Sequence, residues 1–97
     1  MMKEAKAMNK LREHEAIYLI REELGKAEMK FPRFPVDPIH AASLVAEEAG
    51  ELVQATLQAT YDNISIEKAK KEAIHTGATA LRFLINLDNY ITKPDQV

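Results

Sequence analysis

The chain has 97 residues, enough for a single domain spanning 1–97, and carries a net charge of −2 with no basic stripe, which argues against a nucleic-acid polymer as partner. It contains no cysteine, so disulfides and thiolate metal sites are excluded and a reducing compartment is favoured. No apolar run approaches the roughly 20 residues that a membrane-spanning helix needs, and the first residues lack the apolar core of a signal peptide. We therefore expect a soluble cytoplasmic protein with no membrane partner.

Residues 1–9 are polar, and we expect them to form a loose lead-in to a first helix over about 10–30. Apolar residues recur there at intervals of three and four, as in an amphipathic helix; they are Ile17, Ile20, Leu24 and Ala27. Charged residues fill the other positions and are expected on the solvent side; they include Glu13, Glu22, Glu23 and Lys26. Gly25 weakens this helix slightly and is expected to mark a close crossing with a neighbour.

A proline-rich loop follows the first helix. The three prolines within residues 32–38 prevent the helix from continuing, because proline lacks a backbone N–H and restricts the residue before it. Asp37 before Pro38 predicts a helix N-cap followed by proline at the first helical position. Phe31 and Phe34 in this loop either seal the end of a helical bundle or offer a stacking surface to a nucleotide base.

Two further helices are expected, over about 39–61 and about 66–89, with a turn at 61–65 in which Asn63 or Ser65 caps the third helix. The second helix carries an apolar stripe of Ile39, Ala42, Ala46, Ala49, Val53 and Leu57. The third carries a wider one of Ile66, Ala69, Ala73, Ile74, Gly77, Ala80, Leu81, Leu84, Ile85, Leu87 and Ile91.

The apolar face of the third helix covers about half of its circumference, which is more than one small neighbouring helix can bury. A chain of this size also gains from burying surface against another copy. No segment has the pattern of a strand, and the residues from Thr92 onward are expected to be loose. The sequence therefore predicts an all-α fold, a short antiparallel helical bundle completed by oligomerisation.

The second helix also carries Glu47, Glu48 and Glu51, three carboxylates within five residues. At 100° per residue they project within about 100° of each other, so they repel unless a cation lies between them. The ordinary interpretation of such a run is a solvated acidic face. The helix has a polar stripe of His40, Ser43, Glu47, Glu51, Gln54 and Gln58, with Glu48 at its edge. Gly50 between these carboxylates serves either close packing or room for a ligand.

A second pair of charged residues, Glu72 and His75, lies three apart on the third helix. The intervening chain is long enough to turn back, so antiparallel helices would bring the pair opposite Glu48 and Glu51. Three carboxylates and one imidazole form a sensible site for Mg²⁺ or Mn²⁺. The stripe that carries Glu72 also holds residues that would contact phosphate oxygens or simply form helix surface; these are Lys68, Arg82 and Asn86.

The segment Glu47-Glu48-Ala49-Gly50-Glu51-Leu52, followed by Glu72-Ala73-Ile74-His75, resembles the MazG-like all-α nucleoside triphosphate pyrophosphohydrolases. The family pattern is EExxE, a spacer, then ExxD, and the resemblance covers about residues 38–90. It implies hydrolysis of a nucleoside or deoxynucleoside triphosphate to monophosphate and pyrophosphate with Mg²⁺, in a homodimer or homotetramer whose helices complete each bundle. It also implies Glu48, Glu51 and Glu72 as metal ligands, and Glu47 as an accessory catalytic carboxylate that orients water or a second ion.

The sequence departs from the family at His75, where the pattern has aspartate. A neutral imidazole removes one negative charge and one hard oxygen ligand, which favours Mn²⁺ or a later transition metal over Mg²⁺. The substitution also fits a degenerate member that does not hydrolyse nucleotides. Beyond the third helix the family carries phosphate-binding residues, and only Arg82, Asn86 and Lys93 are available here for that role.

Two other functions fit the same residues. Glu72-x-x-His75 with a glutamate on a partner helix is the ligand pattern of di-iron and di-manganese carboxylate bundles. A helical interaction module without enzymatic activity is the second alternative, because charged helix faces usually serve only solvation.

Overall fold

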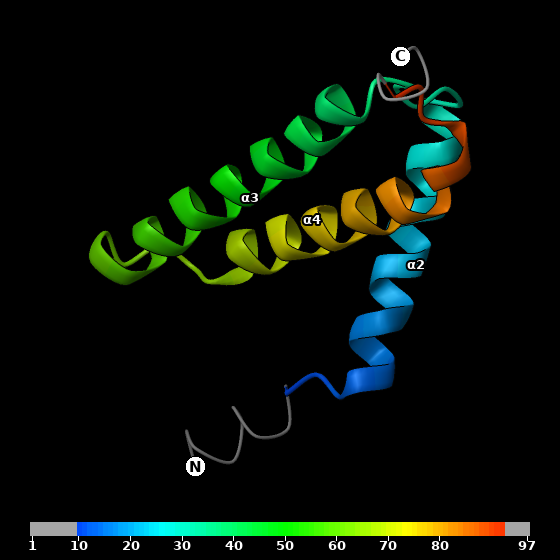
Figure 1. The fold of residues 1–97 in the computed structure, drawn as a ribbon. Helices are drawn as coiled ribbons and strands as arrows, with labels where there is room; N and C mark the ends of the chain where they lie inside the picture. Colours follow the sequence, from blue (N-terminus) through cyan, green and yellow to red (C-terminus); the bar gives the residue numbers. More distant parts are fainter. Residues whose placement is uncertain (1–9, 93–97) are drawn as a thin grey trace.

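A computed structural model describes residues 10–92 (Figure 1). The described residues contain three α-helices and one short 3-10 helix, namely α2 (Glu13–Lys30), α3 (Pro38–Tyr61), α4 (Glu67–Ile85) and η1 (Leu87–Asn89). No strand occurs in this range, so the predicted all-α class is confirmed. None of these helices is long and apolar enough to cross a membrane. The expected loose segments at 1–9 and beyond Thr92, and with them Lys93, lie outside the described residues.

The first helix, α2, begins three residues later than the apolar pattern suggested. The backbone N–H of Arg12 donates to the carboxylate of Glu15 at 2.8 Å, half of a capping box, which fixes the start of the helix at Glu13. The end at Lys30, ahead of the proline-rich loop, agrees with the prediction.

Asp37 and Pro38 set the start of α3, as the sequence predicted. The Asp37 carboxylate accepts hydrogen bonds from the backbone N–H groups of Ile39 at 2.9 Å and His40 at 3.4 Å. Pro38 occupies the first helical position, where a missing N–H costs nothing. Both features confirm the predicted cap.

The turn between α3 and α4 contains both polar residues that were expected to cap α4, but neither is its N-cap, which is Ile66 without a side-chain cap hydrogen bond. Asn63 adopts a left-handed conformation, with φ of 57°, and the Ser65 hydroxyl accepts from the backbone N–H of Glu67 at 3.1 Å. The third helix then ends at Ile85, four residues before the predicted end. The Asn86 side-chain amide donates to the backbone carbonyl of Arg82 at 2.9 Å, and the chain tightens into η1.

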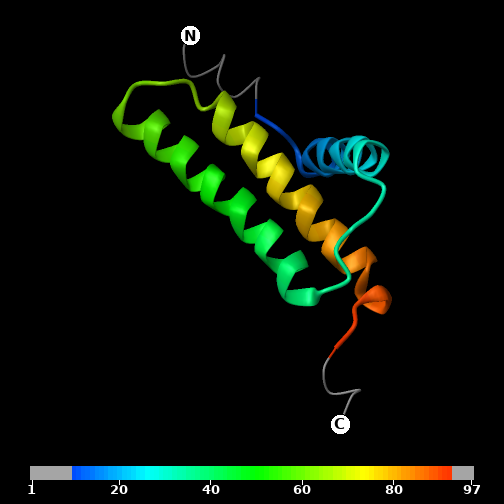
Figure 2. The same ribbon diagram turned by 90° about the horizontal axis from the view of Figure 1, so that it is seen from above.

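The helix α4 lies between the other two (Figure 2). It runs antiparallel to α3, and α2 crosses it steeply on the other side, so the backbones of α2 and α3 do not approach each other. A side chain on Gly77 would place its Cβ 2.9 Å from Cδ1 of Ile20, so Gly77 marks the close crossing. Among the described residues, no atom of another helix lies within 4 Å of a Cβ built on Gly25, so the crossing expected there was wrong.

The core within one chain is small and consists of alanine. The fully buried apolar residues of the described chain are Ala41, Ala55, Ala69 and Ala78. On α3 the face against α4 includes Ala41, Glu48 and Ala55, spaced by one heptad. The predicted apolar stripe of α3 lies mostly on another face, where Ile39 and Val53 are exposed by 77% and 58%. The helix therefore has two apolar faces, and α4 covers only one of them.

Candidate metal centre

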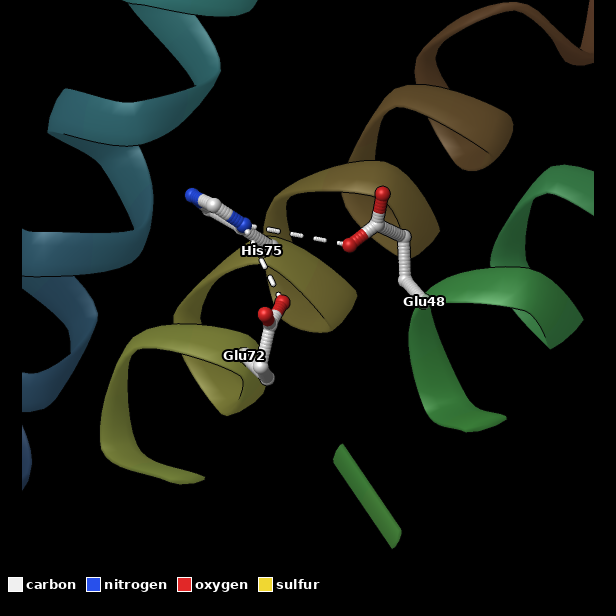
Figure 3. Close-up of side chains that lie close together, drawn as sticks. All are labelled: Glu48, Glu72 and His75. Carbon is white, nitrogen blue, oxygen red and sulfur yellow. Dashed lines mark ion pairs between the residues drawn. The ribbon is translucent and has the colours of Figure 1, made fainter. Parts of the chain in front are cut away.

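Three of the four predicted metal ligands converge between α3 and α4 (Figure 3). Glu48 reaches across from α3 to Glu72 and His75, which are one turn apart on α4. One ligand atom from each residue lies within 4.8 Å of the others. The Nδ1 atom of His75 is 3.4 Å from Oε1 of Glu72 and 3.8 Å from Oε2 of Glu48. The antiparallel pairing that the sequence implied is what brings these atoms together.

The carboxylate oxygens that face the imidazole lack hydrogen-bond donors. Oε2 of Glu48 and Oε1 of Glu72 are buried and have no hydrogen-bond partner among residues 10–92. A buried acceptor left without a partner costs about 1–3 kcal/mol, and more when it is charged. Two carboxylate oxygens and one imidazole nitrogen form a donor set that suits Mn²⁺ and its neighbours in the transition series. The cluster therefore fits a divalent cation.

The electrostatics of the cluster act mainly on Glu48. Burial raises the pKa of its carboxyl above the ordinary value, and the nearby charge of Glu51 raises this pKa further. Smaller contributions from Glu72 and Glu47 act in the same direction, while His75 opposes them. Without a bound cation, the surroundings of Glu48 therefore make its ionisation less favourable than that of an ordinary glutamate.

A fourth residue, Glu23, joins the cluster from α2. Its Oε2 atom lies 3.5 Å from Nε2 of His75, and its side chain is half-buried. The expectation that Glu23 faces solvent was wrong, because α2 crosses α4 with this side turned inward. Only about 40° on the helical wheel separates Glu23 from the apolar Ala27, which was the available signal.

The contact with Glu23 completes an arrangement common at metal sites. Figure 3 shows the second ring nitrogen of His75 directed toward α2, while Nδ1 faces the two carboxylates. A histidine ligand usually donates its other N–H to a carboxylate, which fixes the tautomer and the ring orientation. Glu23 is placed to do this for Nε2, which leaves the lone pair of Nδ1 for a cation.

The remaining predicted residues lie around this cluster rather than in it. Glu51 is exposed and falls outside the group of converging ligand atoms, although its charge still acts on Glu48. Glu47 is exposed and lines a neighbouring cavity. Lys68, at the start of α4, is exposed and does not line this cavity. Asn86 is half-buried, and its amide is directed at a backbone carbonyl.

A cavity of about 470 Å³ adjoins the cluster, a size typical of small-molecule sites. Its walls come from the last turns of α2, the proline-rich loop and the facing sides of α3 and α4. Glu48 and His75 open into it, and the rings of Phe31 and Phe34 form part of its wall. Phe34 is half-buried, whereas Phe31 is 59% exposed, so the ring of Phe31 is open to a ligand.

The side chain of Arg82 is buried beside this cavity. Its guanidinium donates to the backbone carbonyls of Ala27, at 3.4 Å, and of Phe31, and it stacks on the ring of Phe34 at 5.0 Å from the centroid. The last carbonyls of a helix have no partner within the helix, so a cation there is favourable. Arg82 therefore ties the end of α2 and the loop to α4.

No protein-family model, no curated protein and no solved structure matches this chain. The resemblance to MazG-like proteins therefore stays a prediction that rests on residues 47–52 and 72–75 and on their arrangement in space.

The raised pKa of Glu48 predicts a pH-dependent stability in metal-free protein. Between the ordinary pKa of a glutamate and the raised value, the folded protein binds more protons than the unfolded chain, so stability falls as pH rises through this window. Glu48→Gln removes the titrating carboxyl and with it this loss of stability. The variant should therefore melt at a higher temperature than wild type at pH 8 in EDTA. The difference should vanish below about pH 4, where the carboxyl is neutral in both states. Thermal melts across this range measure it, and a constant difference at all pH values would contradict it.

The position of Glu23 predicts its effect on metal affinity. Glu23→Gln should weaken Mn²⁺ binding by about ten- to a hundredfold, the usual effect of removing a carboxylate that orients a histidine ligand. The matched control is Glu28→Gln, which removes the same charge from an exposed position on α2. Calorimetric titration with Mn²⁺ provides the measurement. Equal affinities in the two variants would show that Glu23 does not support His75.

Proposed function

We propose that this protein is a metal-dependent nucleotide pyrophosphohydrolase of the MazG-like type, which converts a nucleoside or deoxynucleoside triphosphate to monophosphate and pyrophosphate. The observation that carries the proposal is the convergence of Glu48, Glu72 and His75, with two unpartnered carboxylate oxygens, at the edge of a cavity of ligand size. A cavity that joins a cation site to an exposed aromatic ring suits a nucleotide better than it suits a purely structural metal ion.

Each acidic residue has a role in this proposal. Glu48, Glu72 and His75 would hold the cation, and Glu51, one turn further along α3, would supply a further ligand if its exposed side chain rotates toward them. When bound, a divalent cation neutralises charge on the phosphates and activates water for attack. Glu47 is exposed in the cavity wall and makes no hydrogen bond to a described residue, and in this proposal its carboxylate orients the attacking water.

The histidine sets the choice of metal. With His75 in place of an aspartate, the cluster has one fewer negative charge and one fewer oxygen ligand, so Mn²⁺ is preferred over Mg²⁺. Coordination requires an unprotonated Nδ1, so protons compete with the cation for this nitrogen, and acid should weaken metal binding and activity with it.

The proposal includes assembly into a homodimer or homotetramer. The single chain fully buries no apolar side chain larger than alanine within residues 10–92. On the side of α3 and α4 away from the metal cluster, a shallow apolar hollow of about 500 Å³ is exposed; its lining consists of Ala42, Val45, Ala46, Ala49, Ala80, Phe83 and Leu84. A second copy that contributes the same face would bury these residues and complete a helical bundle.

Activity is tested with a panel of nucleoside and deoxynucleoside triphosphates and Mn²⁺, with pyrophosphate release as the readout. Wild type should release pyrophosphate from at least one member of the panel. Glu72→Gln should lower the rate by about a hundredfold or more, since it removes one ligand from the cation site formed by Glu48, Glu72 and His75. His75→Asp should shift the preference from Mn²⁺ toward Mg²⁺ and preserve or raise the activity.

The control for this series is Glu67→Gln, which removes an exposed carboxylate from the first turn of α4. It should leave the rate within about twofold of wild type. Absence of pyrophosphate release from every nucleotide would contradict the proposed activity. Two bound metal ions per site together with that absence would favour the dinuclear carboxylate bundle, and no metal binding at all would favour an interaction module.

Assembly is tested by sedimentation at micromolar concentration. Wild type should sediment as a dimer or tetramer, and Ala46→Glu should lower the mass to that of a monomer, because it places a charge in the apolar hollow. Gln54→Glu is the matched control, since it adds the same charge to the exposed polar stripe of α3. A monomeric wild type would contradict the proposed assembly.

A further inference from the structure

Three cations lie along one edge of the cavity beside the metal cluster. Lys26 and Lys30 are one turn apart on α2 and therefore share a face of the helix, and Arg33 follows in the loop. All three side chains line the cavity and are exposed. We name these three residues the cationic rim. The α3 wall carries the carboxylates of Glu47 and Glu48, and Glu23 lines the cavity one turn before Lys26 on α2, so the cavity has an acidic side next to the metal cluster and a cationic side toward the end of α2.

The charges of the cationic rim are not neutralised within the described chain. No ion pair joins any of its three members to a carboxylate of residues 10–92. The ammonium group of Lys30 lies 5.5 Å from the centroid of the exposed Phe31 ring. A favourable interaction with the carboxyl end of α2 explains a lysine in the last turn. It does not explain Lys26, one turn earlier, or Arg33, beyond the helix.

The guanidinium of the buried arginine is engaged with the protein itself. The guanidinium of Arg82 donates to the carbonyls of Ala27 and Phe31 and packs against Phe34, so its donors are already directed at the protein backbone. These contacts hold the end of α2 and the loop in place on α4. The cationic rim is built on this fixed segment, and its side chains remain free to contact an anion.

We infer that the cationic rim binds the phosphate chain of the nucleotide and that the exposed face of Phe31 contacts its base. This inference rests on the proposed function and names the residues that recognise the substrate. A divalent cation held by Glu48, Glu72 and His75 would attract phosphate oxygens to the acidic side of the cavity. The remaining negative charge of a polyphosphate then faces Lys26, Lys30 and Arg33 on the other side. The phosphate contacts that the sequence analysis predicted for Lys68, Arg82 and Asn86 of the third helix are assigned in this inference to the cationic rim at the end of α2.

The first experiment measures binding of inorganic tripolyphosphate by calorimetry in the presence of Mn²⁺. Lys26→Gln/Lys30→Gln should weaken tripolyphosphate binding by about tenfold or more, and Arg33→Gln should weaken it by several-fold, with Mn²⁺ affinity unchanged. Lys70→Gln/Lys71→Gln, which removes two exposed charges from the start of α4, is the matched control and should bind as wild type does. Lys68→Gln tests the phosphate contact that the sequence analysis predicted for Lys68. This variant should also bind tripolyphosphate as wild type does.

The second experiment distinguishes the contribution of the Phe31 ring to nucleotide binding from the contribution of the phosphate contacts. The probes are α,β-methylene analogues of purine and pyrimidine nucleoside triphosphates, which resist cleavage between the α- and β-phosphates. Phe31→Leu should weaken binding of the analogues by about fivefold or more and leave tripolyphosphate binding unchanged. Thermal melts check that each variant is folded, which is expected because all these side chains are exposed.

The outcomes distinguish this inference from the proposed function. Equal tripolyphosphate affinity in the rim variant and wild type, or an equal loss in the rim variant and the Lys70→Gln/Lys71→Gln control, would overturn the role of the rim. Failure of wild type to bind tripolyphosphate while it binds Mn²⁺ would overturn it too. Equal loss of analogue and tripolyphosphate affinity in Phe31→Leu would remove the ring contact. Rim-dependent binding in a protein that releases no pyrophosphate would support the rim and remove the proposed hydrolysis.

Discussion

The arrangement of the three helices centres on two carboxylates that face each other with only an imidazole between them. Oε2 of Glu48 and Oε1 of Glu72 are buried without a hydrogen-bond donor, and both face Nδ1 of His75. Because Glu23 meets the other nitrogen of the same ring, one side chain on α4 contacts acids from all three helices. Folding therefore concentrates negative charge at the junction of the helices. Such a junction is stabilised by any cation that binds the folded chain and not the unfolded one.

The small core follows from the alanines of α3 and α4. Alanine lets helices approach closely, but each buried alanine removes little apolar surface from water, so one chain gains little free energy from its core. The larger apolar side chains of α3, such as Ile39 and Val53, lie on the face that α4 does not cover. The acid cluster and this uncovered face occupy different sides of α3. A second copy could therefore cover the apolar face without closing the cavity.

Local chemistry explains which parts of the structure could be predicted from the sequence. Asp37 and Pro38 define the start of α3 through contacts with adjacent residues, and the pairing of Glu48 with Glu72 and His75 follows from spacing and one antiparallel turn. The role of Glu23 could not be derived in this way, because it depends on the angle at which α2 crosses α4. Periodicity also cannot tell which of two apolar faces a chain covers by itself, so the stripe predicted on α3 contained its outward face.

The packing of α2 against α4 alone has a consequence for the dynamics of the molecule. Its backbone rests on α4 alone, so α2 can open locally at a lower free energy than the α3–α4 pair, in which the helices pack along their length. Such an opening would remove Glu23 from His75 and carry Lys26 and Lys30 away from the carboxylates in the same motion. Hydrogen exchange of the α2 amides thus reports on the metal cluster and on the cavity together. A ligand that bridges the two would slow that exchange without touching most of the helix.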